Sequence, residues 1–352
     1  MSAPLNIGFL PLTDAAPLIA AVDFGIAQAE GLALALHRDV SWANLRDRLM
    51  VGHYDAAHML APLALAASMG VGQAKCPLRA PFLLNLNGNG ITLSKRLLED
   101  FAAIGCEPLA DWVTAARGFA AVVRARQATG ASRLTLATVH LFSAHTYLLR
   151  RFLRAGGLDP DGDVELVVAP PPFMVDFMDR GLIDGFCVGS PWNSLAVDRG
   201  RGVLVALGCE VLADAPEKVL AMPAQGRLTR DGEGDGEGVA LLRALGQACA
   251  FVADPANRGD LTQAMARPDR LDCPAEVIAR TLSGRLALDQ HGALRERADF
   301  IRFTGQGLHR PDGCAPLIVE QMMEAGQISD RAGAMATAEE VFAPDLAIAA
   351  GL

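Results

Sequence analysis

Short apolar runs alternate with stretches of helical periodicity along the first two thirds of the chain. The apolar runs predict strands at Leu5–Leu10, Leu32–His37, Tyr54–Leu60, Leu134–Val139 and Val164–Val168. Between them, apolar residues recur at helical spacing, as Leu45 and Leu49 do, which is typical of an amphipathic helix. Strands that alternate with helices predict an α/β fold class, with a parallel sheet and helices on its faces.

The stretch from Ser41 to Pro62, SWANLRDRLMVGHYDAAHMLAP, combines a helix start with a buried strand. Ser41 is a good N-cap, and Trp42 and Asn44 lie in the first turn of a helix that Gly52 ends. The unpaired backbone N–H groups and the positive end of the helix dipole are then close to these two side chains. The pattern indicates an anion-binding corner.

A second stretch, Phe173 to Gly189, repeats this order of helix, glycine and strand. Each copy has a glycine, an aspartate and a proline at the same spacing: Gly52, Asp55 and Pro62 in the first, and Gly181, Asp184 and Pro191 in the second. The repetition predicts two similar lobes, each of which closes one side of a ligand cleft.

The remaining patterns complete a two-lobed plan. Phe82–Leu93, FLLNLNGNGITL, predicts a strand, an Asn/Gly turn and a strand. Glu217–Leu220 is expected to cross back to the first lobe as a hinge strand, and Thr229–Gly238 is expected to be a glycine-rich surface loop before C-terminal helices. We therefore assign 1–94 to the first segment of lobe 1, 95–217 to lobe 2 with a helical insertion at 95–130, and 218–352 to a return to lobe 1 and C-terminal helices.

Composition excludes several classes of partner. The net charge is −9 and the pI is about 5.3, and no Lys/Arg run with interleaved aromatics occurs, so nucleic acid is not expected as a direct partner. No apolar run approaches the ~20 residues that span a bilayer, so no membrane contact is expected.

The seven cysteines form no C-x-x-C pair, which favours reduced structural thiols. The start MSAPLNIGFLPL has no signal-peptide pattern and predicts a cytoplasmic protein, although a sequence from which the signal peptide had been removed would show the same pattern.

Five motifs, SWANLRD, HMLAP, NLNGNGITL, AGGLDPDGDVELVVAPPP and CVGSPWN, resemble the nitrate and bicarbonate-type solute-binding proteins of ABC transporters along nearly the whole chain. The resemblance implies a two-lobed, periplasmic-binding-protein-like fold of type II, with a ligand cleft between α/β lobes and a helical C-terminal part. Within the family, the chain looks more like the cytoplasmic nitrate and nitrite sensor that controls an RNA-binding antiterminator.

The resemblance also implies the ligand residues. Matched by motif, they are Trp42, Asn89, His145 and Lys218, with Pro171 lining the wall and Asn44 in the first turn beside Trp42. Nitrate is a planar monoanion with weak acceptor oxygens, so an ammonium group and directed N–H donors suit it. A bicarbonate binder that recruits calcium needs a carboxylate near the ligand, and the lysine at 218 favours nitrate or nitrite instead. No metal ion, cofactor or catalytic residue is expected.

Three functions remain as alternatives. The first is a sensor that sequesters the antiterminator and releases it when nitrate or nitrite binds. The second is the substrate-binding component of a nitrate ABC transporter. The third is an enzyme, because relatives of this fold include a pyrimidine-precursor synthase that consumes its own histidine. The sequence contains no Cys-rich metal motif, Ser-His-Asp arrangement or phosphate loop, so we predict that the protein is not an enzyme.

Several candidate residues also have ordinary structural interpretations. Without the resemblance, Trp42 would be interpreted as a residue packed in the core, and Lys218 as a solvated surface lysine. His58 is interpreted as a hydrogen-bonded core histidine, Asn85 and Asn87 as partners of turn backbone, and Cys187 as a small buried apolar residue.

Overall fold

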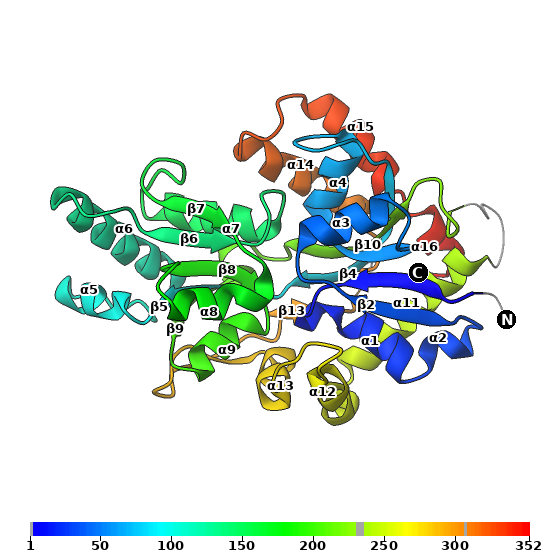
Figure 1. Cartoon of the computed structure of the whole chain (residues 1–352), viewed down its shortest axis with the longest axis horizontal. Helices are drawn as coiled ribbons and strands as arrows, with labels where there is room; N and C mark the ends of the chain where they lie inside the picture. The colour runs from blue at the N-terminus through cyan, green and yellow to red at the C-terminus, as the bar shows by residue number, and fades with distance from the viewer. Residues whose placement is uncertain (1–2, 230–235, 306–307) are drawn as a thin grey trace.

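The computed structural model describes residues 3–229, 236–305 and 308–352. Two sheets, each covered by helices, form two lobes that lie side by side (Figure 1). We call the part built on the larger sheet the first lobe and the part built on the smaller sheet the second lobe. The predicted α/β class is confirmed.

The first lobe contains a six-stranded sheet with the order β13-β4-β10-β3-β1-β2. Its strands are β1 (Leu5–Phe9), β2 (Leu34–Arg38), β3 (Ala56–Leu60), β4 (Leu78–Asn87), β10 (Pro216–Pro223) and β13 (Ile301–Arg302). Strands β2, β1 and β3 are parallel, and β10 is antiparallel to both of its neighbours, β3 and β4.

The second lobe repeats this arrangement in a five-stranded sheet with the order β7-β6-β8-β5-β9. Its strands are β5 (Asn89–Ser94), β6 (Thr135–Thr138), β7 (Glu165–Val168), β8 (Gly185–Gly189) and β9 (Gly202–Leu207). Strands β7, β6 and β8 are parallel, and β5 is antiparallel to β8 and β9. Each sheet therefore contains an antiparallel strand, β10 or β5, that follows a strand of the other sheet in the chain; in the first sheet the short edge strand β13 is also antiparallel to its neighbour β4.

The duplicated motif makes the same contact in both lobes. The backbone N–H of Asp55 donates to Asn6 O at 2.8 Å, and its Oδ2 accepts from Asn6 N at 2.8 Å. Asp184 pairs in the same way with the backbone of Thr135, at 2.7 and 2.9 Å. Each aspartate thus fixes the start of the neighbouring parallel strand, which explains its conserved spacing from the glycine within the two copies.

The predicted strand, turn and strand at 82–93 is not a hairpin. β4 ends at Asn87 in the first sheet and β5 begins at Asn89 in the second, so the Asn/Gly turn carries the chain between lobes. β5 therefore belongs to the second sheet, and the predicted boundary after residue 94 is placed too late. Asn87 and Gly88 have φ angles of 61° and 98°, which asparagine and glycine adopt more readily than other residues.

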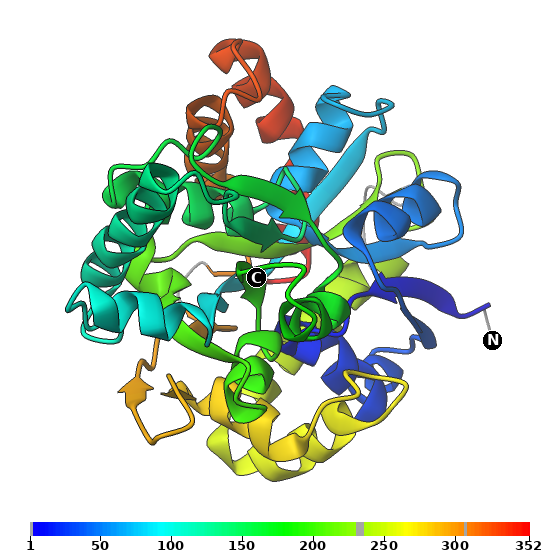
Figure 2. The same cartoon turned by 60° about the vertical axis from the view of Figure 1, so that its left-hand side comes forward.

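Helices cover both faces of the first sheet, and the C-terminal helices pack on this lobe. They are α1 (Ala16–Asp23), α2 (Ile26–Ala29), α3 (Trp42–Met50), α4 (Ala61–Met69), α11 (Glu237–Ala253), α12 (Arg258–Ala266), α13 (Ala275–Ser283), α14 (Ala315–Glu324), α15 (Arg331–Val341) and α16 (Asp345–Ala349). In two views, α14 and α15 lie at the opposite end of the lobe from α12 and α13 (Figures 1 and 2). The chain between β1 and β2 forms two helices, α1 and α2, because Gly25 adopts a left-handed φ of 72° between them.

The second lobe carries a smaller set of helices. They are α5 (Leu97–Ala103), α6 (Trp112–Ala128), α7 (Ala144–Ala155), α8 (Met174–Asp179), α9 (Trp192–Asp198) and α10 (Gly208–Val211). A two-stranded hairpin, β11 (Arg285–Ala287) with β12 (Leu294–Glu296), stands apart from both sheets. Most of the predicted glycine-rich loop, 230–235, lies outside the described residues.

Within the described ranges, no single helix is long and apolar enough to cross a membrane, and one bent pair, Glu237–Ala253 with Pro255–Ala266, meets that test only jointly, by length and composition. The seven cysteines are free thiols. Cys187 is buried in β8, as predicted, and burial holds its pKa well above the ordinary value.

Candidate ligand-binding site

A buried cluster of polar side chains lies where the two lobes meet. The first lobe contributes Asp14 from the turn after β1, Trp42 from the first turn of α3, His58 from β3, and Glu217 and Lys218 from β10; the second lobe contributes Asn89 from the start of β5 and His145 from the first turn of α7. All seven residues are at most 2% exposed. The carboxyl ends of parallel strands gather at the same edge of a sheet, so both sheets direct these loops and helix starts to the junction between the lobes.

Lys218 is at the centre of the cluster. Its Nζ lies 2.8 Å from Asp14 Oδ2 and 2.5 Å from Glu217 Oε1, and 5.3 Å from the ring centroid of Trp42. Burial alone would lower the pKa of Lys218, but the two carboxylates outweigh it and the pKa stands above its ordinary value. For Asp14, burial opposes ionisation, and Lys218 and His58 together hold its pKa well below the usual range.

Glu217 binds residues of both lobes. Asn89 Nδ2 donates to its Oε2 at 2.7 Å, and His145 Nδ1 lies 3.4 Å from its Oε1. Consecutive residues of a regular strand point to opposite faces, but the register of β10 against β4 shifts between Pro216 and Lys218, so Glu217 and Lys218 both reach the cluster. Burial raises the pKa of Glu217, and Lys218 only partly offsets this effect.

Two imidazoles complete the cluster. Burial lowers the pKa of both His58 and His145, so each ring is neutral at physiological pH. His58 Nε2 lies 3.0 Å from Asp14 Oδ1, at ion-pair distance but without the geometry of a hydrogen bond. The interpretation of His58 as a buried histidine with a polar partner holds, and that partner is Asp14, so the ring also belongs to the polar cluster.

Polar atoms from both lobes have no hydrogen-bond partner among the described residues, although they are buried. They are Trp42 Nε1, His58 Nδ1, Asn89 Oδ1, both ring nitrogens of His145 and Ser190 Oγ. A Cβ at Gly189 would lie 3.4 Å from Asn89 Oδ1 and 3.6 Å from His145 Nε2. Buried polar groups normally find partners, so these unpaired groups, two of which lie beside Gly189, mark the candidate site for a small polar ligand.

The structure brings four of the six predicted residues together and leaves two apart. Trp42, Asn89, His145 and Lys218 meet in the cluster. Asn44 does occupy the first turn of α3, but its side chain is exposed and its backbone N–H donates to Ser41 Oγ at 3.2 Å. Pro171 is buried at the start of a 3-10 turn, Pro171–Phe173, and its contact with a ligand stays a prediction.

Sequence reasoning missed Asp14, Glu217 and Gly189. Asp14 lies in a 3-10 turn, Thr13–Ala15, whose cap makes no side-chain hydrogen bond. A charged pair inside an apolar strand, as in PEKVLAMP, is the signal that could have identified Glu217. The carboxylates also weaken the argument that Lys218 alone selects an anion, because the lysine is already paired twice.

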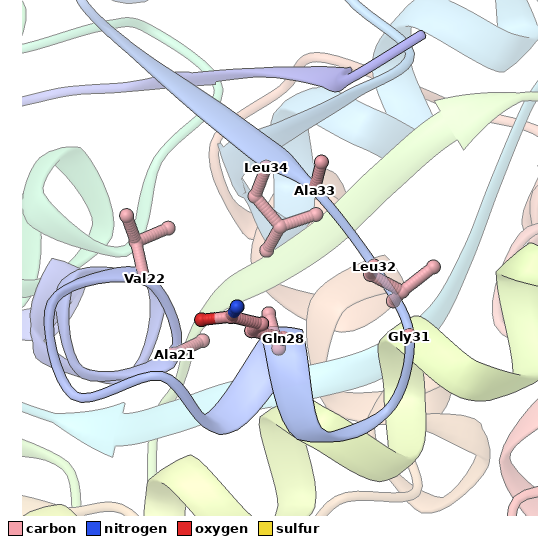
Figure 3. A pocket seen from close by; sticks show the side chains of 8 residues that line it. Ala21, Val22, Gln28, Gly31, Leu32, Ala33 and Leu34 are labelled. Atoms are coloured by element: carbon pink, nitrogen blue, oxygen red, sulfur yellow. The ribbon is translucent and has the colours of Figure 1, made fainter. Parts of the chain in front are cut away.

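Another hollow, of about 490 Å³, lies away from this cluster between α1, α2 and β2 (Figure 3). Its wall carries apolar side chains, including Val22, Leu32 and Leu34, and the polar side chain of Gln28. No charged side chain lines it, so it does not suit a small anion. In the described part of the chain, no group of three or more His, Cys, Asp or Glu side chains could hold a metal ion; the absence of a metal stays a prediction.

Comparisons with known proteins identify the family of the chain. Residues 2–266 match the NMT1-like family. The chain belongs to this family. The nitrate/nitrite binding protein NrtA of Synechococcus elongatus is 33% identical to this NMT1-like protein over 315 residues, which cover 87% of the chain and 68% of the relative. The nitrate import ATP-binding protein NrtC of Synechocystis sp. is 32% identical over 346 residues, which cover 97% of the chain and 49% of the relative.

Solved structures identify the fold of this NMT1-like protein. The periplasmic nitrate-binding protein NrtA from Synechocystis PCC 6803 superposes with a TM-score of 0.87 at 24% identity, covering 99% of this chain and 88% of that one. The fold is periplasmic-binding-protein-like, as predicted. The chain spans about half the length of the first curated relatives, which include a bicarbonate transport ATP-binding protein CmpC of Synechococcus elongatus at 33% identity, 87% coverage of the chain and 43% of the relative.

Proposed function

We propose that the protein binds nitrate or nitrite between its lobes. The observation that carries the proposal is the set of buried, unpaired polar groups at the junction, contributed by both lobes beside the ammonium of Lys218. The indole N–H of Trp42 is a donor without a partner among the described residues, and the start of α3 adds the positive end of a helix dipole. The names of the NrtA relatives support a nitrogen oxyanion as the ligand.

Binding energy in this site would come from donors of both lobes, so the ligand favours the closed arrangement. The lobes touch directly beside the cluster: Thr13 N donates to Ser190 O at 2.7 Å, and Trp192 Nε1 donates to Pro11 O at 3.1 Å. A ligand that binds one conformation better than another shifts the population toward it. Lobe closure is therefore the step that transmits the binding event.

Calorimetry with nitrate, nitrite, sulfate and bicarbonate, the last with and without Ca²⁺, tests the ligand. We expect nitrate or nitrite to bind and sulfate not to bind. The variant Trp42→Phe keeps an aromatic ring and removes the indole donor, so it should weaken binding about 10-fold or more, the worth of a hydrogen bond to a charged group. Binding of bicarbonate with Ca²⁺ while both nitrogen oxyanions remain silent would overturn the proposal.

We further propose that the protein acts in the cytoplasm as a sensor that sequesters an RNA-binding antiterminator and releases it when the oxyanion binds. Support comes from the motif resemblance and from the net charge of −9, which complements the basic face that an RNA-binding partner presents. Pull-down of such an antiterminator with and without nitrate tests this role. Equal recovery in both conditions would refute it.

The alternative setting is the substrate-binding part of a nitrate ABC transporter, and it is favoured by the names of the NrtC and CmpC relatives. On either proposal the protein binds its ligand without turning it over. Fractionation of cells that express the native gene separates the two settings. Recovery with membranes or periplasm supports transport, and recovery in the cytosol together with the antiterminator supports sensing.

A further inference from the structure

The charges of the cluster do not suit a simple anion site. Asp14 and Glu217 are two carboxylates, while Lys218 is the one permanent cation among the described residues that contacts them. His58 and His145 are neutral because burial lowers their pKa. A monoanion added beside Lys218 would give this buried site a second excess negative charge, and uncompensated buried charge is very costly.

The geometry around His145 identifies where compensation is needed. Its Nδ1 faces Glu217 Oε1 at 3.4 Å, and its Nε2 lies on the side of Gly189 and Asn89. An ionised Glu217 favours a hydrogen on Nδ1, which leaves Nε2 as a lone pair that repels an anion. A protonated Glu217 can donate to Nδ1 instead, which places the hydrogen on Nε2, where it can donate to the ligand.

We propose that Glu217 takes up one proton from solvent when the anion binds, so that the site accepts a monoanion and a proton together. The inference rests on the proposed oxyanion function and deepens it. The proton comes from bulk water or buffer and forms the O–H bond of the Glu217 carboxyl, while nitrate, the anion of a strong acid, stays ionised. Glu217 is thus a positioning residue that sets the tautomer of His145.

The surroundings of Glu217 support this assignment over the other acids. Asp14 accepts contacts from both Lys218 and His58 and keeps a low pKa. Burial, the first cause, raises the pKa of Glu217, and the negative charge of Asp14 raises it further, whereas Lys218 and the Asn89 amide lower it. The thiol of Cys187 on β8 faces the same group and is neutral, since burial and the Glu217 charge raise its pKa.

Calorimetry of nitrate binding in buffers of different ionisation enthalpy measures the proton directly. At pH 8 the apparent enthalpy should change linearly with buffer ionisation enthalpy, with a slope of about one proton taken up, and Kd should rise about tenfold per pH unit. Solution NMR of ¹⁵N-histidine protein should also show His145 changing from the Nδ1–H to the Nε2–H tautomer when nitrate is added.

Two matched variants separate Glu217 from its neighbour. Glu217→Gln carries no titratable proton and can donate to His145 Nδ1, so it should bind nitrate with no proton uptake and with affinity independent of pH. Asp14→Asn removes one excess negative charge from the cluster and one of the causes that raise the Glu217 pKa, so its proton uptake should fall below that of the unmodified protein while Glu217 keeps its carboxylate. Nitrate binding without dependence on the buffer in the unmodified protein, or uptake that persists in Glu217→Gln, would overturn this inference, whereas absence of nitrate binding would overturn the proposed function itself.

Discussion

At the residue scale, the structure changes what Lys218 does. The sequence alone predicts that Lys218 supplies a free positive charge to the ligand, so that its removal would abolish nitrate binding and leave the fold intact. In the structure it joins Asp14 and Glu217 in an ion-paired cluster that is fully buried. A buried charge that loses its partner is strongly destabilising, so Lys218 has a structural role as well.

We therefore expect Lys218→Ala to lower the free energy of unfolding by about 3–5 kcal/mol, because two buried carboxylates lose their cation. Urea denaturation followed by circular dichroism measures the change. The double variant Lys218→Met with Glu217→Gln removes charge of both signs and should recover part of the loss. Lys95→Ala, at an exposed lysine, is the control and should change stability by about 0.5 kcal/mol or less. A similarly small change in stability for Lys218→Ala would contradict a structural role for its ion pairs.

The buried histidines predict how stability depends on pH. His58 and His145 have folded-state pKa values below the ordinary 6.5, so the unfolded chain binds more protons as pH falls through that value. Their contribution is complete above pH 6.5 and is lost on acidification. The melting temperature should fall from pH 7 to 5.5, and less steeply in His145→Gln. His53→Gln, at an exposed loop position, should keep the pH dependence of the unmodified protein's melting temperature. An equally reduced pH dependence in His53→Gln would contradict the assignment of this effect to the buried histidines.

The residue scale also marks where sequence reasoning stops. Trp42, Asn89, His145 and Lys218 are recognisable because the resemblance to a family implies them, and Trp42 and Asn89 lie in two of its motifs, SWANLRD and NLNGNGITL. The charged pair in PEKVLAMP draws attention to Glu217, but strand periodicity places it opposite Lys218, and only the register shift in β10 brings both to one side. His58 shows a related limit: an apolar strand predicts a buried histidine that needs a polar partner, but not that this partner is Asp14 of the cluster.

At the element scale, two paired segments carry the chain between lobes. Asn87 N donates to Ala215 O and Ala215 N donates to Asn87 Oδ1, both at 2.9 Å. Asn87 Nδ2 also donates to Asp299 O at 2.9 Å. The sequence predicts the turn residues correctly, but not that strands β4 and β5 belong to different sheets. Local turn chemistry is the same for a hairpin and for a crossover, so only the partner strands decide between them.

Asn87→Ala should destabilise the protein by about 2–4 kcal/mol, since it removes two side-chain hydrogen bonds and places a Cβ-bearing residue without a polar group at φ 61°. Asn87→Gly loses the same hydrogen bonds but relieves the backbone strain, so it should cost less. Denaturant unfolding of the two variants measures both contributions. Equal stability of Ala and Gly at this position would show that the left-handed backbone carries no cost.

At the scale of the whole molecule, the two sheets share one strand order and exchange one strand each. The duplicated Gly, Asp and Pro spacing predicted this symmetry from sequence, and the aspartates make the same backbone contacts in both lobes. What sequence could not give is the contact between lobes. Thr13 contacts Ser190, and Trp192 contacts Pro11, between the lobes through backbone and indole groups whose residue types carry no obvious signal.

Trp192→Phe tests whether this contact holds the closed state. The variant keeps an aromatic ring but removes the indole donor to Pro11 O, a bond worth about 0.5–1.5 kcal/mol. We expect a larger radius of gyration by solution X-ray scattering without ligand, restored compaction with nitrate, and a Kd raised about 2- to 10-fold, because the ligand must then also close the lobes. Trp112→Phe, on α6 away from the cleft, is the matched control. Unchanged scattering and affinity in Trp192→Phe would mean that the buried polar cluster determines closure, and that the hydrogen bond from Trp192 to Pro11 does not.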